Sequence, residues 1–352
     1  MKLVVNARFL TQNMTGVQRY AVEICLELKR MMGDDIEFVA PNNIEQKEYA
    51  QKLSVKIIGN RKGHFWEQID LPCYLKRNGN PLLLCLCNTA PLFYKNKIVT
   101  VHDVAFEAYP QTFNKAFLYT YRFLIPRIMR TALKVITVSQ FSKDEINKYY
   151  GIEKQKIEVV FSAVADKFHI EEDEKLKKHK YFLAVSSLNY RKNFLSVLQA
   201  FGIFEKKCFD VSLYIIGDLD NSNFKNVDTS RYHNDHRIKF LGRVSDDNLV
   251  KYYSNAMAFL FPSIYEGFGL PPLEAQTCGC PVLVSDIPPH HEVVEDSGFF
   301  CDPYKPEEMA NAMLEIGHYS EELKRKGFEN IKRFSFKKSA QQIYNIILDC
   351  SK

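Results

Sequence analysis

The stretch of sequence that decides the fold is FPSIYEGFGLPPLEAQTCGCPVLVSDIPPHHEVVEDSGFFCDP, residues 261–303. It continues an apolar run that starts at residue 256 and is typical of a buried parallel strand. A turn rich in Gly and Pro follows, and residues 273–278 are predicted to form a short helix that Gly279 ends. Residues 281–285 are a second apolar strand. Strand, loop, helix and strand together predict one crossover unit of a parallel α/β sheet.

The loop of this unit is predicted to bind a ligand, because open α/β sheets bind ligands outside the carboxyl ends of their strands. Gly267 and Gly269 let backbone N–H groups approach an anion, and the following helix points its positive end to the same place. Glu266 and Glu274 bracket the loop. This arrangement suits a ligand with a central phosphate and hydroxyl groups at both ends, as in a nucleotide-sugar. The alternative is a loop and a helix that only pack, with two solvated glutamates.

Composition indicates a globular chain of two domains. The 352 residues are 46% apolar and 25% charged, which is enough for two cores of ordinary size. No apolar stretch approaches the roughly 20 residues that span a bilayer, and the N-terminal apolar run is too short for a signal peptide. The odd number of cysteines, nine, predicts reduced thiols in a cytoplasmic protein. The Cys-x-Cys pairs lack the paired spacing of a zinc site.

The charge is distributed unevenly along the chain. Residues 1–168 contain 24 Lys and Arg against 16 Asp and Glu, whereas the remainder contains 23 against 26. A basic first half suits an anionic partner such as a membrane surface or a phosphorylated lipid. Ordinary surface variation explains it equally well. We expect no nucleic acid among the partners.

The first half of the chain predicts a parallel sheet with two candidate site residues. A strand over residues 2–6 precedes a loop with Gly16 and a helix from residue 17 to about 31, a local pattern that suits a phosphate contact. Residues 36–40, 55–58, 81–87 and 97–101 read as further strands. His102 and Asp103 follow the last of these, where a His can hydrogen-bond a sugar hydroxyl. A structural His–Asp pair is the alternative.

Residues 112–133 predict a long helix, kinked near Pro126, that is rich in aromatic residues and arginines. We favour a core position for its aromatic stripe, and a contact with a membrane or a lipid-linked acceptor is the alternative. A strand over residues 157–161 closes the first domain, and a mixed charge run over 171–180 predicts an exposed linker. The predicted domains are 1–168 and 175–335, followed by an amphipathic helix in the final segment, 336–352.

The second half repeats the same local pattern. A strand over 181–185, a loop over 186–193, a helix over 194–204 and a strand over 211–216 succeed one another. Arg191 and Lys192 lie at the start of that helix, where two cations suit a diphosphate; an exposed charge pair is the alternative. The chain has no G-x-G-x-x-G after a strand and no G-x-x-x-x-G-K-[ST], which disfavours nicotinamide dehydrogenases and P-loop hydrolases. Asp218-Leu-Asp220 lies away from the two glutamates, so no metal site is predicted.

These motifs resemble the retaining GT-B glycosyltransferases of the group 4 type, in their mannosyltransferase-like branch. The signature of that family is matched by Glu266-Gly-Phe-Gly-Leu-Pro-Pro-Leu-Glu274-Ala and then by Gly279-Cys-Pro-Val282. Thr15-Gly-Val-Gln-Arg-Tyr20, the His102-Asp103 pair and the Arg191-Lys-Asn193 loop match further segments. The chain departs from many relatives at Ser186 and Ser187, where they have Gly and a basic residue. The resemblance implies an α/β fold of two Rossmann-like domains that face a central cleft, with the final helix packed back on the first domain.

The resemblance also implies roles for particular residues. Glu266 and His102 are the expected catalytic residues: Glu266 accepts hydroxyls of the donor sugar and stabilises positive charge at its anomeric carbon. Glu274 holds the ribose, and the segment 238–244 holds the base. No metal and no cofactor are implied, so the leaving diphosphate must be neutralised by cations and backbone amides. The expected donor-binding residues are Arg191, Lys192, Gly267, Phe268, Gly269, Leu270, Glu274, Val244 and Gly16.

The expected reaction is retaining transfer of a hexose, with GDP-mannose favoured as the donor. The expected acceptor is a glycan or an undecaprenyl-linked oligosaccharide in the synthesis of a surface polysaccharide, such as the O-antigen of lipopolysaccharide. We expect a cytoplasmic protein, with peripheral contact at the inner face of the cell membrane. The alternatives are a rhamnosyl-, fucosyl- or glucosyl-type transferase of the same fold, or an epimerase or hydrolase of sugar nucleotides.

Overall fold

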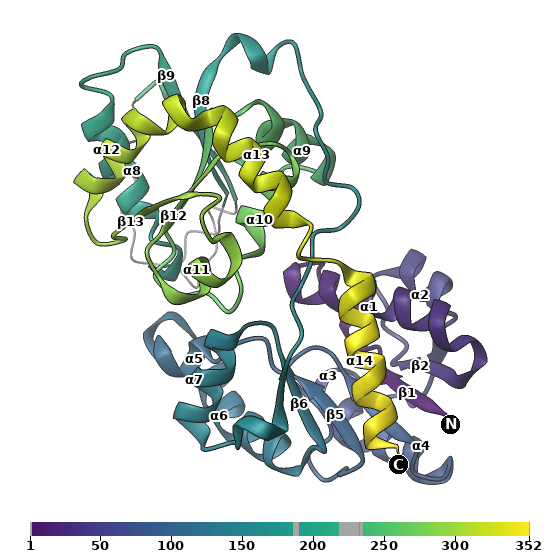
Figure 1. The fold of residues 1–352 in the computed structure, drawn as a ribbon. Helices are drawn as coiled ribbons and strands as arrows, with labels where there is room; N and C mark the ends of the chain where they lie inside the picture. Colours follow the sequence, from purple (N-terminus) through teal and green to yellow (C-terminus); the bar gives the residue numbers. More distant parts are fainter. Residues whose placement is uncertain (1, 186–189, 218–231, 233–234, 352) are drawn as a thin grey trace. The chain divides into compact units, whose positions relative to one another are not determined.

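The computed structural model describes residues 2–185, 190–217, 232 and 235–351, and it divides into two compact units (Figure 1). Unit 1 consists of Met1–Ala108, Lys115–Ala163 and Ser335–Lys352, and unit 2 of Tyr109–Asn114 and Val164–Phe334. Unit 2 therefore includes residues 164–168, which the sequence analysis assigns to the first domain, and residues 169–174, which lie between the two predicted domains. The Ser186–Ser187 pair and the Asp218-Leu-Asp220 sequence lie outside the described residues.

Unit 1 is built around a parallel sheet of seven strands in the order β3-β2-β1-β4-β5-β6-β7. Its central strands are apolar and buried, as expected for a parallel sheet that helices cover on both faces. The pairing places Leu3 opposite both Ile36 and Leu82, so the first strand lies in the middle of the sheet. The strands are β1 (Leu3–Asn6), β2 (Ile36–Ala40), β3 (Lys56–Ile57), β4 (Leu82–Cys85), β5 (Lys97–Thr100), β6 (Lys134–Thr137) and β7 (Ile157–Val159).

The helices of unit 1 include the last helix of the chain. Helix α14 packs beside α1 (Figure 1), where the rings of Phe336 and Tyr20 lie 6.5 Å apart. The Ser339 hydroxyl donates a hydrogen bond of 2.7 Å to the carbonyl of Phe161. The helices are α1 (Gly16–Met32), α2 (Lys47–Leu53), α3 (Gly63–Phe65), the π-helical turn η3 (Trp66–Asp70), α4 (Leu71–Arg77), α5 (Ala105–Ala108), α6 (Lys115–Thr131), α7 (Gln140–Tyr150) and α14 (Phe336–Cys350).

The core position favoured for the aromatic stripe of α6 is wrong for part of it. Tyr119 is 70% exposed and Phe123 51% exposed. The buried face of α6 is instead formed by aliphatic side chains of its second half, among them Ile125 and Ile128. Tyr119 and Phe123 are four residues apart and share a different helix face, because helical neighbours recur every three or four residues. Aromatic content alone did not identify the buried face.

Unit 2 is built around a parallel sheet of six strands in the order β10-β9-β8-β11-β12-β13. Strand β11 pairs in parallel with β8 on one side and β12 on the other. The loops that follow β8, β11 and β12 therefore all lie at the carboxyl end of the sheet. The strands are β8 (Lys180–Val185), β9 (Val211–Ile216), β10 (Ile238–Gly242), β11 (Ala258–Phe261), β12 (Val282–Ser285) and β13 (Phe299–Cys301).

The helices of unit 2 cover this sheet. Helices α12 and α13 follow one another with a 3-10 turn over Ile316–Tyr319 between them. No helix among the described residues has the length and apolarity needed to cross a membrane. The helices are α8 (Phe194–Phe204), α9 (Asp246–Asn255), α10 (Leu270–Thr277), α11 (Pro288–Val294), α12 (Pro306–Glu315) and α13 (Ser320–Ile331).

Candidate functional site

The loop after β11 ends in a tight turn over residues 266–270, called the Glu266 turn below, in which residues 266–269 are buried. Gly269 precedes α10 with φ +101°, a conformation that glycine adopts readily. Helix α10 starts at Leu270, three residues earlier than the predicted start at Leu273. Pro271 and Pro272 lie in its first turn, where the N–H that proline lacks has no partner within the helix. The two prolines begin the helix instead of extending the loop.

Glu266 forms an ion pair with Lys192. Lys192 Nζ lies 2.5 Å from Glu266 Oε1, and their side chains are only 21% and 11% exposed. The same ammonium lies 5.0 Å from the ring of Phe261, the last residue of β11. Burial by itself would raise the pKa of Glu266, but the cations of Lys192 and Arg191 outweigh it and hold the pKa below its ordinary value. Glu266 is therefore an ionised carboxylate at neutral pH.

Arg191 and Lys192 lie on a 3-10 turn, Tyr190–Lys192, between β8 and α8. The N–H of Ile264 donates a hydrogen bond of 2.8 Å to the carbonyl of Arg191, which ties this turn to the loop after β11. The Arg191 guanidinium also lies 5.4 Å from the ring of Phe113, which belongs to unit 2. The structure thus brings together three predicted site residues from segments far apart in sequence: Arg191, Lys192 and Glu266.

The other predicted residues of unit 2 surround this group or lie further along the same elements. Gly267, Phe268 and Gly269 are buried in the Glu266 turn, whereas Leu270 and Glu274 are half-buried on α10. Phe268 packs edge-on against Phe334, with ring centroids 5.6 Å apart. Val244 follows β10 and packs partly buried against the core. The donor-binding roles assigned to these residues stay predictions.

His102 and Gly16 belong to unit 1. The imidazole of His102 is buried, with Nε2 2.9 Å from the carbonyl of Leu86. Because that carbonyl can only accept, Nε2 carries the proton and Nδ1 is the acceptor. Burial lowers the pKa of His102, although the Leu86 carbonyl and Asp103 oppose the shift. His102 is thus a neutral imidazole, and its catalytic role stays a prediction.

Asp103 and Gly16 have identifiable local surroundings. The carboxylate of Asp103 accepts a hydrogen bond of 2.9 Å from the N–H of Ala105, so it caps the first turn of α5. Gly16 is the first residue of α1, and the helix start is closed by a capping box of Thr15 and Gln18. Gly16 itself is exposed.

A second buried ionic group, which sequence analysis did not identify, lies at the carboxyl end of β1. We call it the Glu67 cluster: Asn6, Arg8, Glu67 and Thr89. Glu67 Oε1 accepts hydrogen bonds from Asn6 at 2.7 Å, Arg8 at 3.2 Å and Thr89 at 3.1 Å. Burial would raise the pKa of Glu67, but Arg8 and His64 outweigh it and lower the pKa to about 2. The only signal in sequence was two charged residues beside apolar segments.

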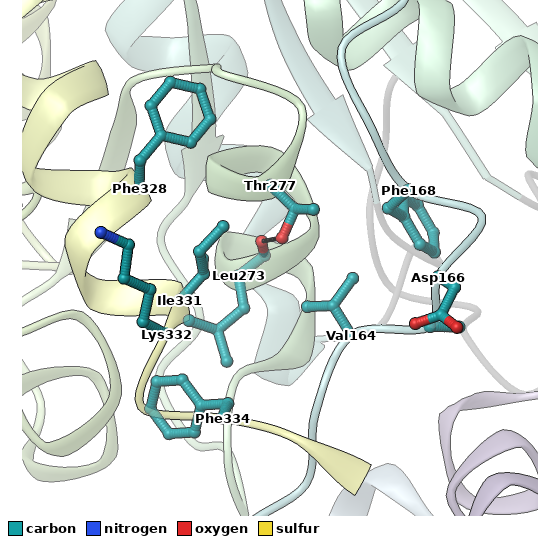
Figure 2. Close-up of a pocket in the computed structure, with 10 residues that line it drawn as sticks. Val164, Asp166, Phe168, Leu273, Thr277, Phe328, Ile331, Lys332 and Phe334 are labelled. Atoms are coloured by element: carbon teal, nitrogen blue, oxygen red, sulfur yellow. Dashed lines mark hydrogen bonds between the residues drawn. The ribbon is translucent and has the colours of Figure 1, made fainter. Parts of the chain in front are cut away.

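A cavity of about 540 Å³ lies against α10 (Figure 2). Leu273 and Thr277 of α10 form one wall, and the Thr277 hydroxyl donates a hydrogen bond of 2.8 Å to the carbonyl of Leu273. The other lining residues come from the first segment of unit 2, from the end of α13 and from the residues just after it: Val164, Ala165, Asp166, Phe168, Phe328, Ile331, Lys332 and Phe334. None of the predicted site residues lines this cavity.

Two comparisons of sequence agree on the family. Residues 166–333 match the family described as "Glycosyl transferases group 1", and residues 14–167 match "Glycosyltransferase Family 4". The chain is 29% identical over 363 residues to the O-antigen chain mannosyltransferase RfbU of Salmonella typhimurium, covering 97% of this chain and 98% of that protein. It is 26% identical to O-antigen chain mannosyltransferase B of Escherichia coli, covering 98% and 99% of the two chains.

Comparison of structures agrees on the fold. The crystal structure of Anabaena HepE in complex with UDP and glucose superposes with a TM-score of 0.74 at 17% sequence identity, over 99% of both chains. A likeness over this length shows a shared fold, and each unit here is built on a parallel sheet of the Rossmann type. Since the two family matches adjoin and together run from residue 14 to residue 333, the chain belongs to the GT-B glycosyltransferases of family 4 and is mannosyltransferase-like.

Proposed function

We propose that this protein transfers a hexose from a nucleotide-sugar to a glycan or lipid-linked oligosaccharide during the synthesis of a surface polysaccharide. The observation that carries the proposal is the ion pair of Lys192 and Glu266 beside the Glu266 turn, which places an ionised carboxylate next to cations and a helix start. Both curated relatives named above are O-antigen chain mannosyltransferases. HepE was crystallised with UDP and glucose, which supports a nucleotide-sugar donor.

In the proposed chemistry the bond between the anomeric carbon and the diphosphate breaks, and residues of opposite charge stabilise its two ends. Arg191, Lys192 and the amides of the Glu266 turn receive the charge that develops on the leaving diphosphate. The Lys192 ammonium has three N–H donors, so it can keep Glu266 and still donate to a phosphate oxygen. Glu266 accepts hydroxyls of the hexose and stabilises positive charge at the anomeric carbon. The acceptor hydroxyl oxygen bonds to the anomeric carbon on the face from which the diphosphate leaves, and its proton passes to the leaving phosphate oxygen. The configuration is therefore retained, and the step uses no metal ion or other cofactor.

GDP-mannose is the proposed donor, on the strength of the two mannosyltransferase relatives. A glucosyl donor is the second candidate, because a further HepE structure is a complex with UDP-glucose. The two donors differ both in the base and in the configuration of one hydroxyl. A site that hydrogen-bonds that hydroxyl should reject the other sugar by a large factor.

We further propose a cytoplasmic protein in peripheral contact with the membrane that carries the acceptor. The exposed rings of Tyr119 and Phe123 on α6 support this, together with the Arg127 guanidinium, which lies 3.9 Å from the Phe123 ring. Aromatic and basic side chains on one helix favour the headgroup region of an anionic membrane. Such binding should weaken as salt rises, because exposed charges are screened over about 10 Å at 0.1 M salt.

The test is to incubate the protein with GDP-mannose, UDP-glucose and other radiolabelled nucleotide-sugars, each with membranes that bear an undecaprenyl-linked glycan. We expect mannose in the lipid-linked fraction with the anomeric configuration of the donor, and equal transfer in the presence of EDTA. Transfer from another donor alone would exclude GDP-mannose but not the reaction class. Release of free sugar at the same rate with and without acceptor membranes would instead indicate a hydrolase.

A further inference from the structure

His290, on α11, is a buried histidine whose ring is fixed from one side. It has no exposed surface, and Nδ1 lies 3.0 Å from the backbone carbonyl of Ser285 and 3.0 Å from the Ser285 hydroxyl oxygen. The Ser285 hydroxyl donates its proton to the carbonyl of Ser263. The Ser285 carbonyl can only accept, so Nδ1 carries the imidazole proton. The other nitrogen, Nε2, is then a hydrogen-bond acceptor.

Nε2 of His290 has no hydrogen-bond partner among the described residues, although it is buried. Buried polar atoms without a partner are rare, and each asks for an explanation such as a ligand or water that completes the pair. The ring is neutral at physiological pH, because burial lowers the pKa of His290 to about 4 while Glu266 opposes the shift. A neutral acceptor cannot pair with a phosphate oxygen, so the missing partner is an O–H or N–H donor.

The free edge of the ring is directed at the Glu266 turn. A side chain at Gly269 would place its Cβ 3.3 Å from His290 Cδ2 and 3.7 Å from Nε2. Because residue 269 is glycine, no side chain covers that edge of the ring at the start of α10. The Glu266 carboxylate raises the pKa of His290 and the Lys192 ammonium lowers it, so both charges lie close enough to act on the ring. The acceptor thus lies within the group of residues that the proposed reaction uses.

We propose that His290 is a specificity-determining residue of the donor site, whose Nε2 accepts a hydrogen bond from a hydroxyl group brought by the hexose. The inference rests on the proposed function, because it needs a sugar beside the Glu266 turn. The hydroxyl can be one of the hexose itself or a water molecule that the hexose holds in place. In either case His290 recognises the hexose and not the nucleotide.

The variant His290→Asn keeps a polar group near the Nδ1 position and removes the acceptor at Nε2, whereas His290→Gln can restore an acceptor there. The matched control is His291→Asn, because His291 is the next residue on the same helix but is half exposed and pairs with Asp286 at 2.5 Å. Calorimetry on the full chain measures binding of GDP, GDP-mannose and the singly deoxygenated analogues of GDP-mannose, with UDP, UDP-glucose and its deoxy analogues as a second series. Thermal unfolding of each variant verifies that it is folded.

We expect His290→Asn to weaken binding of the nucleotide-sugar about fivefold to tenfold and to leave binding of the nucleoside diphosphate unchanged. We expect His290→Gln to recover part of the loss and His291→Asn to bind as the unmodified protein does. A deoxy donor that binds the unmodified protein and His290→Asn equally identifies the missing hydroxyl as the direct partner. A loss that persists with every deoxy donor identifies a bridging water.

A readout that does not depend on activity is the ¹⁵N resonance of His290 Nε2 in histidine-labelled protein. We expect it to move when the nucleotide-sugar is added, as it does when a bare imidazole nitrogen accepts a hydrogen bond, and to stay in place with the nucleoside diphosphate. Equal effects of both ligands on binding and on this resonance would overturn the role of His290 and spare the proposed function. Failure of the unmodified protein to bind any nucleotide-sugar would overturn both.

Discussion

In unit 1 both oxygens of the buried Glu67 carboxylate lie beside hydrogen-bond donors. In unit 2, by contrast, the buried acceptor Nε2 of His290, near Glu266, has no partner among the described residues. Oε1 of Glu67 accepts hydrogen bonds from Asn6, Arg8 and Thr89, and Oε2 lies 3.3 Å from His64 Nδ1. Around Glu266, Lys192 supplies an ion pair, but Nε2 of His290 has no partner among the described residues. A complete network stabilises the fold, and an incomplete one is prepared for a ligand that completes it.

This comparison has a physical basis in what burial does to charge. A buried ion pair is weak evidence of net stability, but removing one partner is costly because the other charge stays buried. Mutations in the Glu67 cluster should therefore lower the unfolding free energy of unit 1. Mutations of Lys192, Glu266 or His290 should instead change binding and turnover.

The largest expected effect is that of Glu67→Ala. It leaves the Arg8 guanidinium buried without its carboxylate, so we expect the unfolding free energy of unit 1 to fall by about 3–5 kcal/mol. Hydrogen exchange read by mass spectrometry separates the amides of unit 1 from those of unit 2. The control is Glu48→Ala, since Glu48 and Lys52 form a solvent-exposed pair whose loss should leave the stability of unit 1 nearly unchanged. Equal protection in the two variants would show that the network does not stabilise unit 1.

Glu266→Gln is expected to act in the opposite way. Removing the carboxylate charge should reduce turnover about 10²–10³-fold, which corresponds to about 2.7–4 kcal/mol of transition-state stabilisation. Thermal unfolding should change little compared with the activity. The comparison variant is Glu308→Gln, which alters a solvent-exposed carboxylate of unit 2 that pairs with Lys305. Near-normal turnover of Glu266→Gln would remove Glu266 from the catalytic site.

Replacing both Arg191 and Lys192 by Ala should weaken binding of the nucleoside diphosphate much more than binding of the nucleoside. Hydrogen bonds to charged groups contribute about 1.5–3 kcal/mol each, so binding of the nucleoside diphosphate should weaken by at least tenfold. Binding of the nucleoside should change much less, which titration calorimetry can measure. Lys206 and Lys207 are adjacent exposed lysines of the same unit and provide the matched double variant. Equal losses for both ligands would argue against diphosphate binding by Arg191 and Lys192.

The smallest expected effect is a decrease in the unfolding free energy of unit 1 at acid pH. The pKa of Glu67 falls from 4.5 to about 2 on folding, so its contribution to stability is complete above the unfolded value and declines as pH falls towards 2. By pH 4 the unfolding free energy of unit 1 should have lost about 1 kcal/mol through this group. In Glu67→Gln that part of the pH dependence should disappear, which hydrogen exchange at pH 7 and pH 4 can show. An unchanged slope would mean that other carboxylates dominate.

Local pattern predicted much of the fold. Helix α8 and strand β9 have the predicted bounds, because their apolar periodicity and their flanking loops are properties of adjacent residues. Local pattern failed at α10, where prolines that seemed to prolong the loop lie in the first turn of the helix. It failed again at α6, because periodicity does not say which of two apolar faces meets the core.

The sequence by itself determined the family-specific motif around Glu266 and Glu274, the succession of strands and helices, and the nomination of Arg191 and Lys192. Only the tertiary structure decided which of these side chains meet. Lys192 and Glu266 pair across 74 residues of sequence, and Asn6 reaches Glu67 across 61. His290 was part of the opening stretch, but only the structure shows that its Nε2 lies beside Gly269 and has no hydrogen-bond partner among the described residues. Propensity and periodicity act between neighbours in the chain, whereas hydrogen bonding and burial depend on neighbours in space.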